Sequence, residues 1–181
     1  MAKVNLFPDF KEFLGLLNSA GVRYVLLGGY AVIFYGHRRM TDDLDVWIAV
    51  DPENTERVST VLRQFGGFSA KAVRPEMFRE KGKVFIFGRE PVRIDILTAP
   101  SGVEFETAYA RRLEVELDGL RVPVINLKDL KLNKAASGRL KDRDDLRHLP
   151  QAWPASGDNV ERRAPGRRRR GAPPNRRSAG R

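Results

Sequence analysis

The 181-residue chain contains no cysteine and only two histidines, His37 and His148. Without cysteine it can form neither a disulfide nor a thiolate metal site, and two histidines make a histidine-built metal site unexpected. The chain also has no apolar run of the roughly 18 to 20 residues that a membrane span requires, and its N-terminus lacks the apolar core of a signal peptide. These absences predict a cytoplasmic protein with no membrane segment.

Positive charge is in excess, with a formal net charge of +10, but it is unevenly distributed. Residues 151–181 contain nine arginines and only two acids, Asp158 and Glu161. This segment has few large apolar side chains, so it cannot bury enough surface to offset the entropy cost of ordering. We therefore expect one domain at 1–150 and a disordered tail at 151–181. The basic run at 167–170 either contacts nucleic acid or has no dedicated role.

The apolar pattern of the first 150 residues predicts an α/β fold. Short β-type runs lie at 22–27, 44–50, 83–87, 92–98, 113–117 and 120–125, and helical patterns at 7–17, 30–35, 52–65, 105–111, 127–137 and 141–149. Turn and cap residues mark the boundaries: Asp51 precedes a proline, Asp118-Gly119 favours a hairpin, Asn126 can cap a helix and Gly138 can end it. We expect a short, mixed, twisted sheet with helices on one face and a small helical part at 126–149.

Acidic residues stand in two of these expected strands. Asp43 and Asp45 are two residues apart, so on a strand they point to the same face while Leu44 and Val46 point into the core. Asp95 lies between Ile94 and Ile96 in a second apolar strand. Neighbouring carboxylates repel one another unless a cation lies between them, so this pattern indicates magnesium-dependent phosphoryl or nucleotidyl chemistry. The alternatives are a solvated loop at Asp43 and Asp45 and a plain surface ion pair between Arg93 and Asp95.

A pair of glycines, Gly28 and Gly29, follows the first expected strand and precedes a short helix. Glycines at a helix N-terminus let backbone N–H groups approach phosphate oxygens closely. An ordinary strand-to-helix turn would have the same sequence, so the pair gains meaning only from its distance to the acids.

These motifs together resemble the signature of the nucleotidyltransferase superfamily with the polymerase-beta-like fold. That signature is an apolar residue, Gly-Gly or Gly-Ser, a spacer, and Asp-x-Asp or Asp-x-Glu between apolar residues. Here it reads Leu27-Gly28-Gly29, thirteen residues, then Asp43-Leu44-Asp45-Val46. The run GGYAVIFYGHRRMTDDLDVWIAV is similar to small bacterial stand-alone members, some of which are toxin or antitoxin components. The run LKDLKLNKAASGRLKDRDDLRHL is similar to their helical end, so the resemblance covers roughly residues 8 to 149.

The resemblance implies transfer of a nucleoside monophosphate from an NTP, such as ATP, to an acceptor hydroxyl with release of pyrophosphate. Asp43, Asp45 and Asp95 are then the catalytic residues and the ligands of Mg²⁺ in a two-metal site. Asp95 would also help to deprotonate the acceptor.

The resemblance further implies that the nucleotide is bound by Gly28, Gly29 and Lys134. Arg39 lies just before the acid strand, and from this position we expect it to reach a phosphate of the nucleotide or to balance the acids. Many relatives carry serine at the place of Gly29 and use its hydroxyl on phosphate. From the residues alone, cations such as Arg39 and Lys134 are more often solvated surface charges.

The acceptor is left open by the sequence. An RNA end or a protein hydroxyl are the first candidates, a small molecule is the next, and a cognate toxin or antitoxin is a possible partner. A protein of another class, a non-catalytic nucleotide- or nucleic-acid-binding protein acting as an antitoxin-like partner, is the competing hypothesis.

Overall fold

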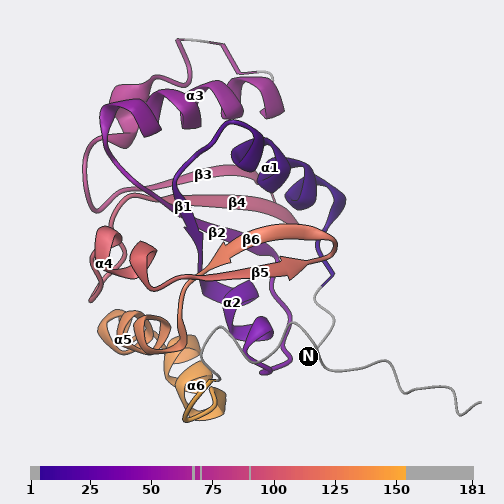
Figure 1. Cartoon of the computed structure of the whole chain (residues 1–181), viewed down its shortest axis with the longest axis vertical. Coiled ribbons are helices and arrows are strands. Elements are labelled where there is room, and N and C mark those ends of the chain that lie inside the picture. Colours follow the sequence, from indigo (N-terminus) through magenta and orange to yellow (C-terminus); the bar gives the residue numbers. More distant parts are fainter. Residues whose placement is uncertain (1–4, 67, 70, 90, 154–181) are drawn as a thin grey trace, which may run out of the picture.

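The computed structural model describes residues 5–66, 68, 69, 71–89 and 91–153. They form a six-stranded sheet with the strand order β3-β4-β2-β1-β6-β5 (Figure 1). The strands are β1 Tyr24–Leu26, β2 Asp43–Ile48, β3 Val84–Arg89, β4 Val92–Leu97, β5 Leu113–Leu117 and β6 Leu120–Val124. The pairs β2–β4 and β1–β6 are parallel and the other three are antiparallel, which confirms the predicted mixed sheet.

Six helices and one short 3₁₀ helix accompany the sheet. They are α1 Pro8–Ser19, α2 Gly28–Phe34, α3 Pro52–Gly66, η1 Pro75–Phe78, α4 Phe105–Ala110, α5 Leu127–Ser137 and α6 Leu140–His148. Figure 1 shows α1 and α3 at one end of the molecule and α5 with α6 at the other. No helix among the described residues is long and apolar enough to cross a membrane.

Alternate residues of β2 point to opposite faces of the sheet, one towards the core and the other towards the site. Leu44 and Val46 are fully buried, whereas the intervening Asp43 and Asp45 are only partly buried. In β3, Phe85 packs on Phe78 of η1 with ring centroids 4.8 Å apart, so this face of the sheet meets the layer that contains α3 and η1. The acids project from the opposite face, as the alternation of the sequence predicts.

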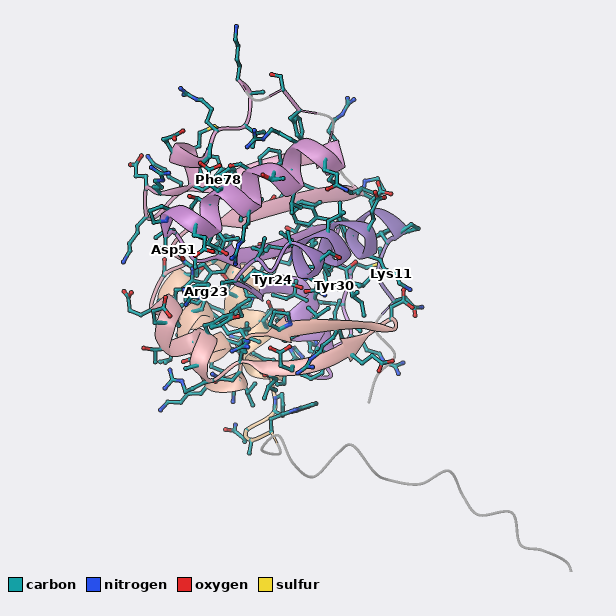
Figure 2. All side chains as sticks on the ribbon, turned by 45° about the horizontal axis from the view of Figure 1, so that its top comes forward. Lys11, Arg23, Tyr24, Tyr30, Asp51 and Phe78 are labelled. Carbon is teal, nitrogen blue, oxygen red and sulfur yellow. The ribbon has the colours of Figure 1, made fainter. Side chains whose placement is uncertain are left out.

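The predicted caps and turns are confirmed. Asp51 accepts a hydrogen bond from the Asn54 backbone N–H at 3.0 Å and starts α3, and Arg23 lies 3.5 Å from its other oxygen (Figure 2). The hairpin turn has Asp118 at φ 50° and Gly119 at φ 78°, the left-handed pair that a two-residue turn requires. Asn126 caps α5 through the Asp129 N–H.

The packed chain extends slightly beyond residue 150. Trp153 meets the rings of Tyr35 and Phe34 at centroid distances of 4.9 and 5.3 Å. Disorder was predicted for 151–181; of these residues, 154–181 lie outside the described part of the chain.

Candidate active site

The parallel pairing of β2 with β4 brings the three predicted acids together. Asp45 and Asp95 are direct register partners, and Asp43 lies one step along the same face of β2. One carboxylate oxygen from each residue lies within 4.8 Å of the other two. Asp95 is only 7% exposed, which excludes a plain surface position for it. The sequence showed two acids on one strand and one on another, and the register shows that they form one cluster.

Arg93 lies within this cluster, because residues 93 and 95 share a face of β4. Its guanidinium donates to both carboxylate oxygens of Asp95 at 2.9 Å and to Asp43 Oδ2 at 3.1 Å. The Arg93–Asp95 pair considered as an alternative is therefore real, but it is part of the acid cluster. A fork-shaped cation that binds two carboxylates lowers their mutual repulsion.

The negative charge of Asp45 is incompletely compensated. Burial, followed by the nearby charges of Asp43 and Asp95, raises the pKa of the Asp45 carboxyl to about 6, although Lys134 and a hydrogen bond from the Gly29 backbone act in the opposite direction. Cations are attracted to such a carboxylate, because neutralisation of its charge is favourable.

Gly28 and Gly29 must be glycines, because side chains from β2 and from the segment before it lie too close for a Cβ atom. Gly28 has φ +63°, and a Cβ at this position would lie 1.7 Å from Asp45 Oδ2. A Cβ on Gly29 would lie 2.1 Å from Thr41 Oγ. The turn therefore accommodates the Asp45 carboxylate and the Thr41 hydroxyl, and the Gly29 N–H is already used by Asp45.

Thr41 is a site residue that the sequence did not reveal. Its hydroxyl donates to Asp43 Oδ1 at 2.8 Å and fills the space that a side chain at position 29 would need. The only available signal was its place two residues before Asp43, which is too common a pattern to interpret.

Arg39 and Lys134, both predicted to bind the nucleotide, meet at a common partner on α6. Arg39 donates hydrogen bonds to Asp145 Oδ1 at 2.7 Å and to Asp145 Oδ2 at 3.1 Å. Lys134 Nζ lies 2.7 Å from the same Asp145 Oδ2 and 2.6 Å from Asp142 Oδ1. Asp145 is fully buried and Lys134 is 4% exposed, so neither cation is a solvated surface charge.

Asp142 and Asp145 were not singled out from the sequence. Burial opposes their ionisation, but hydrogen bonds from Lys134, Ser137 and Arg139 lower the pKa of Asp142 to about 2, and those from Arg39 and Lys134 lower the pKa of Asp145. Their spacing of three residues on α6, downstream of a helical lysine, was the signal that could have found them.

Two groups of side chains in the described part of the chain could be considered for a metal ion. One is the acid cluster, whose hard oxygen ligands suit Mg²⁺. The other contains His37, Asp144 and His148. Its imidazole rings stack at 4.3 Å with planes 6° apart, so their nitrogen lone pairs lie in parallel planes and do not converge on one ion. The acid cluster therefore fits a divalent metal, and the histidine group as arranged does not.

A separate apolar cavity of about 980 Å³ lies where α5 and α6 meet the chain around Trp153. None of the acids lines it. Its walls include Leu127, Leu132, Leu146 and Trp153.

The chain belongs to a family of nucleotidyltransferases. The matching family model is described as a nucleotidyltransferase of unknown function, DUF6036, and it covers residues 5–152. The protein is therefore a nucleotidyltransferase, and the family implies an NTP substrate. No curated protein is similar enough to count as a match.

Two solved structures have a similar fold. The Thermotoga maritima protein TM1012, assigned to the nucleotidyltransferases, aligns with a TM-score of 0.52 and 19% identity over 76% of this chain and 88% of its own. The lincosamide antibiotic adenylyltransferase LnuA, solved with lincomycin bound, aligns with a TM-score of 0.52 and 17% identity over 81% of this chain and 98% of its own. At these identities the likeness concerns the fold alone, and it confirms the nucleotidyltransferase-like architecture.

The contact between Gly28 and Asp45 predicts an unequal cost for two alanine substitutions. Gly28→Ala and Gly138→Ala both place alanine at φ near +64°, but nothing lies within 4 Å of a Cβ at 138. Both lose roughly 1–2 kcal/mol to backbone strain. Gly28→Ala should lose about 2 kcal/mol more, because the Asp45 carboxylate must move. Urea unfolding of both variants measures the difference. Equal losses would contradict the close contact.

The raised pKa of Asp45 predicts a pH effect in metal-free protein. The folded-state pKa of Asp45 lies above the ordinary value of 3.8, so the protonated carboxyl stabilises the folded state. This stabilisation is complete below about pH 4 and is lost as the pH rises through about 6. The loss should be about 2 kcal/mol, since solvent reaches part of the group. The difference in unfolding free energy between Asp45→Asn and the parent, measured in EDTA from pH 4 to 8, should grow in favour of the variant. A difference independent of pH would show that the carboxyl is not perturbed.

Proposed function

We propose that this protein transfers a nucleoside monophosphate from an NTP to an acceptor hydroxyl in a Mg²⁺-dependent reaction, with release of pyrophosphate. The observation that supports this proposal most strongly is the cluster of Asp43, Asp45 and Asp95 on two parallel strands, with Gly28 packed against one of its carboxylates. Two Mg²⁺ ions held by such a cluster would lower the pKa of the acceptor hydroxyl and stabilise charge on the triphosphate.

The reaction forms a bond between the acceptor oxygen and the α-phosphorus and breaks the bond from that phosphorus to the bridging oxygen of pyrophosphate. We assign Asp43 and Asp45 to the triphosphate side, because Gly28 and Thr41 lie against these two residues. Asp95, on the far side of Asp45 in the sheet, is assigned to the acceptor and takes up the hydroxyl proton directly or through water.

Gly28 and Gly29 allow the Asp45 carboxylate and the Thr41 hydroxyl to lie directly against the start of α2. The Thr41 hydroxyl takes the place of the serine hydroxyl that many relatives have at position 29. Arg39 and Lys134 contribute positive potential from their fixed positions on Asp145. Lys134 already lowers the pKa of Asp45, so its influence reaches the acid cluster even while its ammonium group is bound to α6.

Membership of a nucleotidyltransferase family disfavours the alternative of a non-catalytic protein, whether nucleotide-binding, nucleic-acid-binding or antitoxin-like. A protein that only binds nucleic acid would need none of the acids, whereas the described structure assembles all three against the cost of their repulsion. The acceptor is proposed to be a protein hydroxyl, an RNA end or a small molecule. The lincomycin-bound neighbour favours keeping the small molecule among them. The resemblance to toxin–antitoxin members is the sole basis for including a cognate toxin or antitoxin partner in this proposal.

The assignment of Asp43 and Asp45 predicts how nucleotide binding responds to mutation. ATP with Mg²⁺ should raise the melting temperature of the parent, by an amount that follows the mass action of binding. The double variant Asp43→Asn with Asp45→Asn should lose most of this increase, because the metal loses two charged ligands. Asp42→Asn is the matched control, since Asp42 is the exposed neighbouring acid outside the cluster. An unchanged increase in the double variant would place the nucleotide elsewhere.

The assignment of Asp95 predicts a loss of turnover rather than of affinity. Asp95→Asn should reduce single-turnover transfer of the α-phosphate label by roughly 10²–10³, the usual loss when a charge that stabilises a transition state is removed. The dissociation constant of Mg²⁺–ATP should change only a few-fold, because Asp43 and Asp45 are intact. Transfer at near-parental rate would reduce Asp95 to a structural partner of Arg93.

A further inference from the structure

The strand register places an apolar residue directly beside the acid assigned to the acceptor. Asp45 of β2 is paired with Asp95 of β4, and Asp95 is paired with Ile86 of β3. Directly opposed residues of paired strands share a face, with neighbouring Cβ atoms about 4.5–5.5 Å apart in an antiparallel pair. One row across the sheet therefore runs from Asp45 through Asp95 to Ile86. Gly28, at the start of α2, lies against the Asp45 carboxylate.

Ile86 and its face neighbour Val84 are open to solvent. Ile86 is 60% exposed and Val84 is 54% exposed, although both are branched apolar residues in a strand. The alternate residues of β3, Phe85 and Phe87, pack on the other face against Phe78 and Phe68. The strand is therefore buried on one side and presents an apolar pair on the side of the acids.

The sheet face that carries the acids is covered at Trp47. Trp47 lies on the acid face of β2, is 1% exposed, and is covered by the ring of Phe105 at 5.2 Å. Gly28 occupies the flank of Asp45. A molecule that brings a hydroxyl to Asp95 therefore finds the open sheet surface on the β3 side, over Ile86 and Val84.

We propose that Ile86 and Val84 form the acceptor subsite, and that the acceptor carries an apolar group next to its reacting hydroxyl. This inference rests on the proposed function, since it takes Asp95 as the acid nearest the acceptor. The chemistry that fits is a hydroxyl on an aliphatic or aromatic carbon frame, supplied by a free alcohol or by a tyrosine side chain. The end of an RNA chain fits less well, because its ribose and phosphates find no polar partner on two aliphatic side chains.

A series of primary alcohols tests the subsite without knowledge of the natural acceptor. Ethanol, 1-butanol and 1-hexanol are supplied with Mg²⁺ and α-labelled ATP, and formation of the alkyl ester of AMP is measured. In the parent, kcat/KM should rise by up to about three- to four-fold for each methylene that lies on the apolar pair. A short peptide with a central tyrosine and an RNA oligonucleotide with a free 3′ end are compared in the same assay.

The ratio of the rates with 1-hexanol and ethanol is taken within each variant, so that it is independent of total activity. This ratio should fall towards one in Ile86→Asn and in Val84→Asn. It should stay parental in Leu132→Asn, which changes an exposed apolar residue that lines the separate cavity. A parental ratio in both β3 variants, or an RNA end that reacts best and is insensitive to them, would overturn the proposal.

A binding measurement separates failure of the subsite from failure of the proposed function. The methyl NMR signal of Ile86, assigned by its loss in Ile86→Val, should shift saturably when 1-hexanol is added to the full chain with ATP and Mg²⁺. Absence of transfer to water and to every acceptor would refute the proposed function, while this shift would still support an apolar subsite. Methyl shifts confined to Leu127 and Leu132 would overturn the proposed subsite. So would concentration-dependent broadening of Ile86 together with an oligomer that Ile86→Asn dissociates, because a second copy would then cover the face.

Discussion

The mutual repulsion of three carboxylates is the constraint on which the site depends. Parallel pairing of β2 with β4 holds oxygens of Asp43, Asp45 and Asp95 within 4.8 Å of one another, an arrangement that costs free energy unless cations or hydrogen-bond donors compensate for it. Arg93 and Thr41 provide part of this compensation. The raised pKa of Asp45 indicates that this compensation is incomplete, and the remaining negative charge favours the approach of a cation.

A second charged cluster, formed by Asp145, Arg39 and Lys134, connects the C-terminal helices to the site. Asp145 on α6 binds Arg39, from the segment before β2, and Lys134, from α5. A buried carboxylate is tolerated only with such partners. Removal of either cation would leave Asp145 with one cationic partner in place of two. The same contacts fix two positive charges near the acid strand, which links the packing of α5 and α6 to the electrostatics of the site.

Much of the fold and the acid cluster was predictable because the relevant signals are local. Alternation around Leu44 and Val46 gives the face of Asp43 and Asp45, and cap residues such as Asn126 mark helix ends within a few positions. The bridge from Arg93 to Asp43 was not predictable, since it requires knowledge that β2 and β4 are parallel neighbours in one particular register.

Other parts of the site depended on contacts between distant segments. Position before the acid strand singled out Arg39, and the family resemblance singled out Lys134. Their shared partner on α6 became visible only when Arg39 and Asp145, more than one hundred positions apart, were packed together. The exposure of Ile86 had no signature either, because an apolar residue in a strand normally indicates the core.

The most direct test of the central claim is a crystal structure with Mn²⁺ and a non-hydrolysable ATP analogue, with the ions located by anomalous scattering. The account predicts an anomalous peak within coordination distance of Asp43 and Asp45, with the triphosphate beside Gly28. It also predicts a second peak that contacts Asp95. Strong Mn²⁺ peaks elsewhere, with Arg93 still bound to Asp43 and Asp95 and no ion among the three acids, would contradict it.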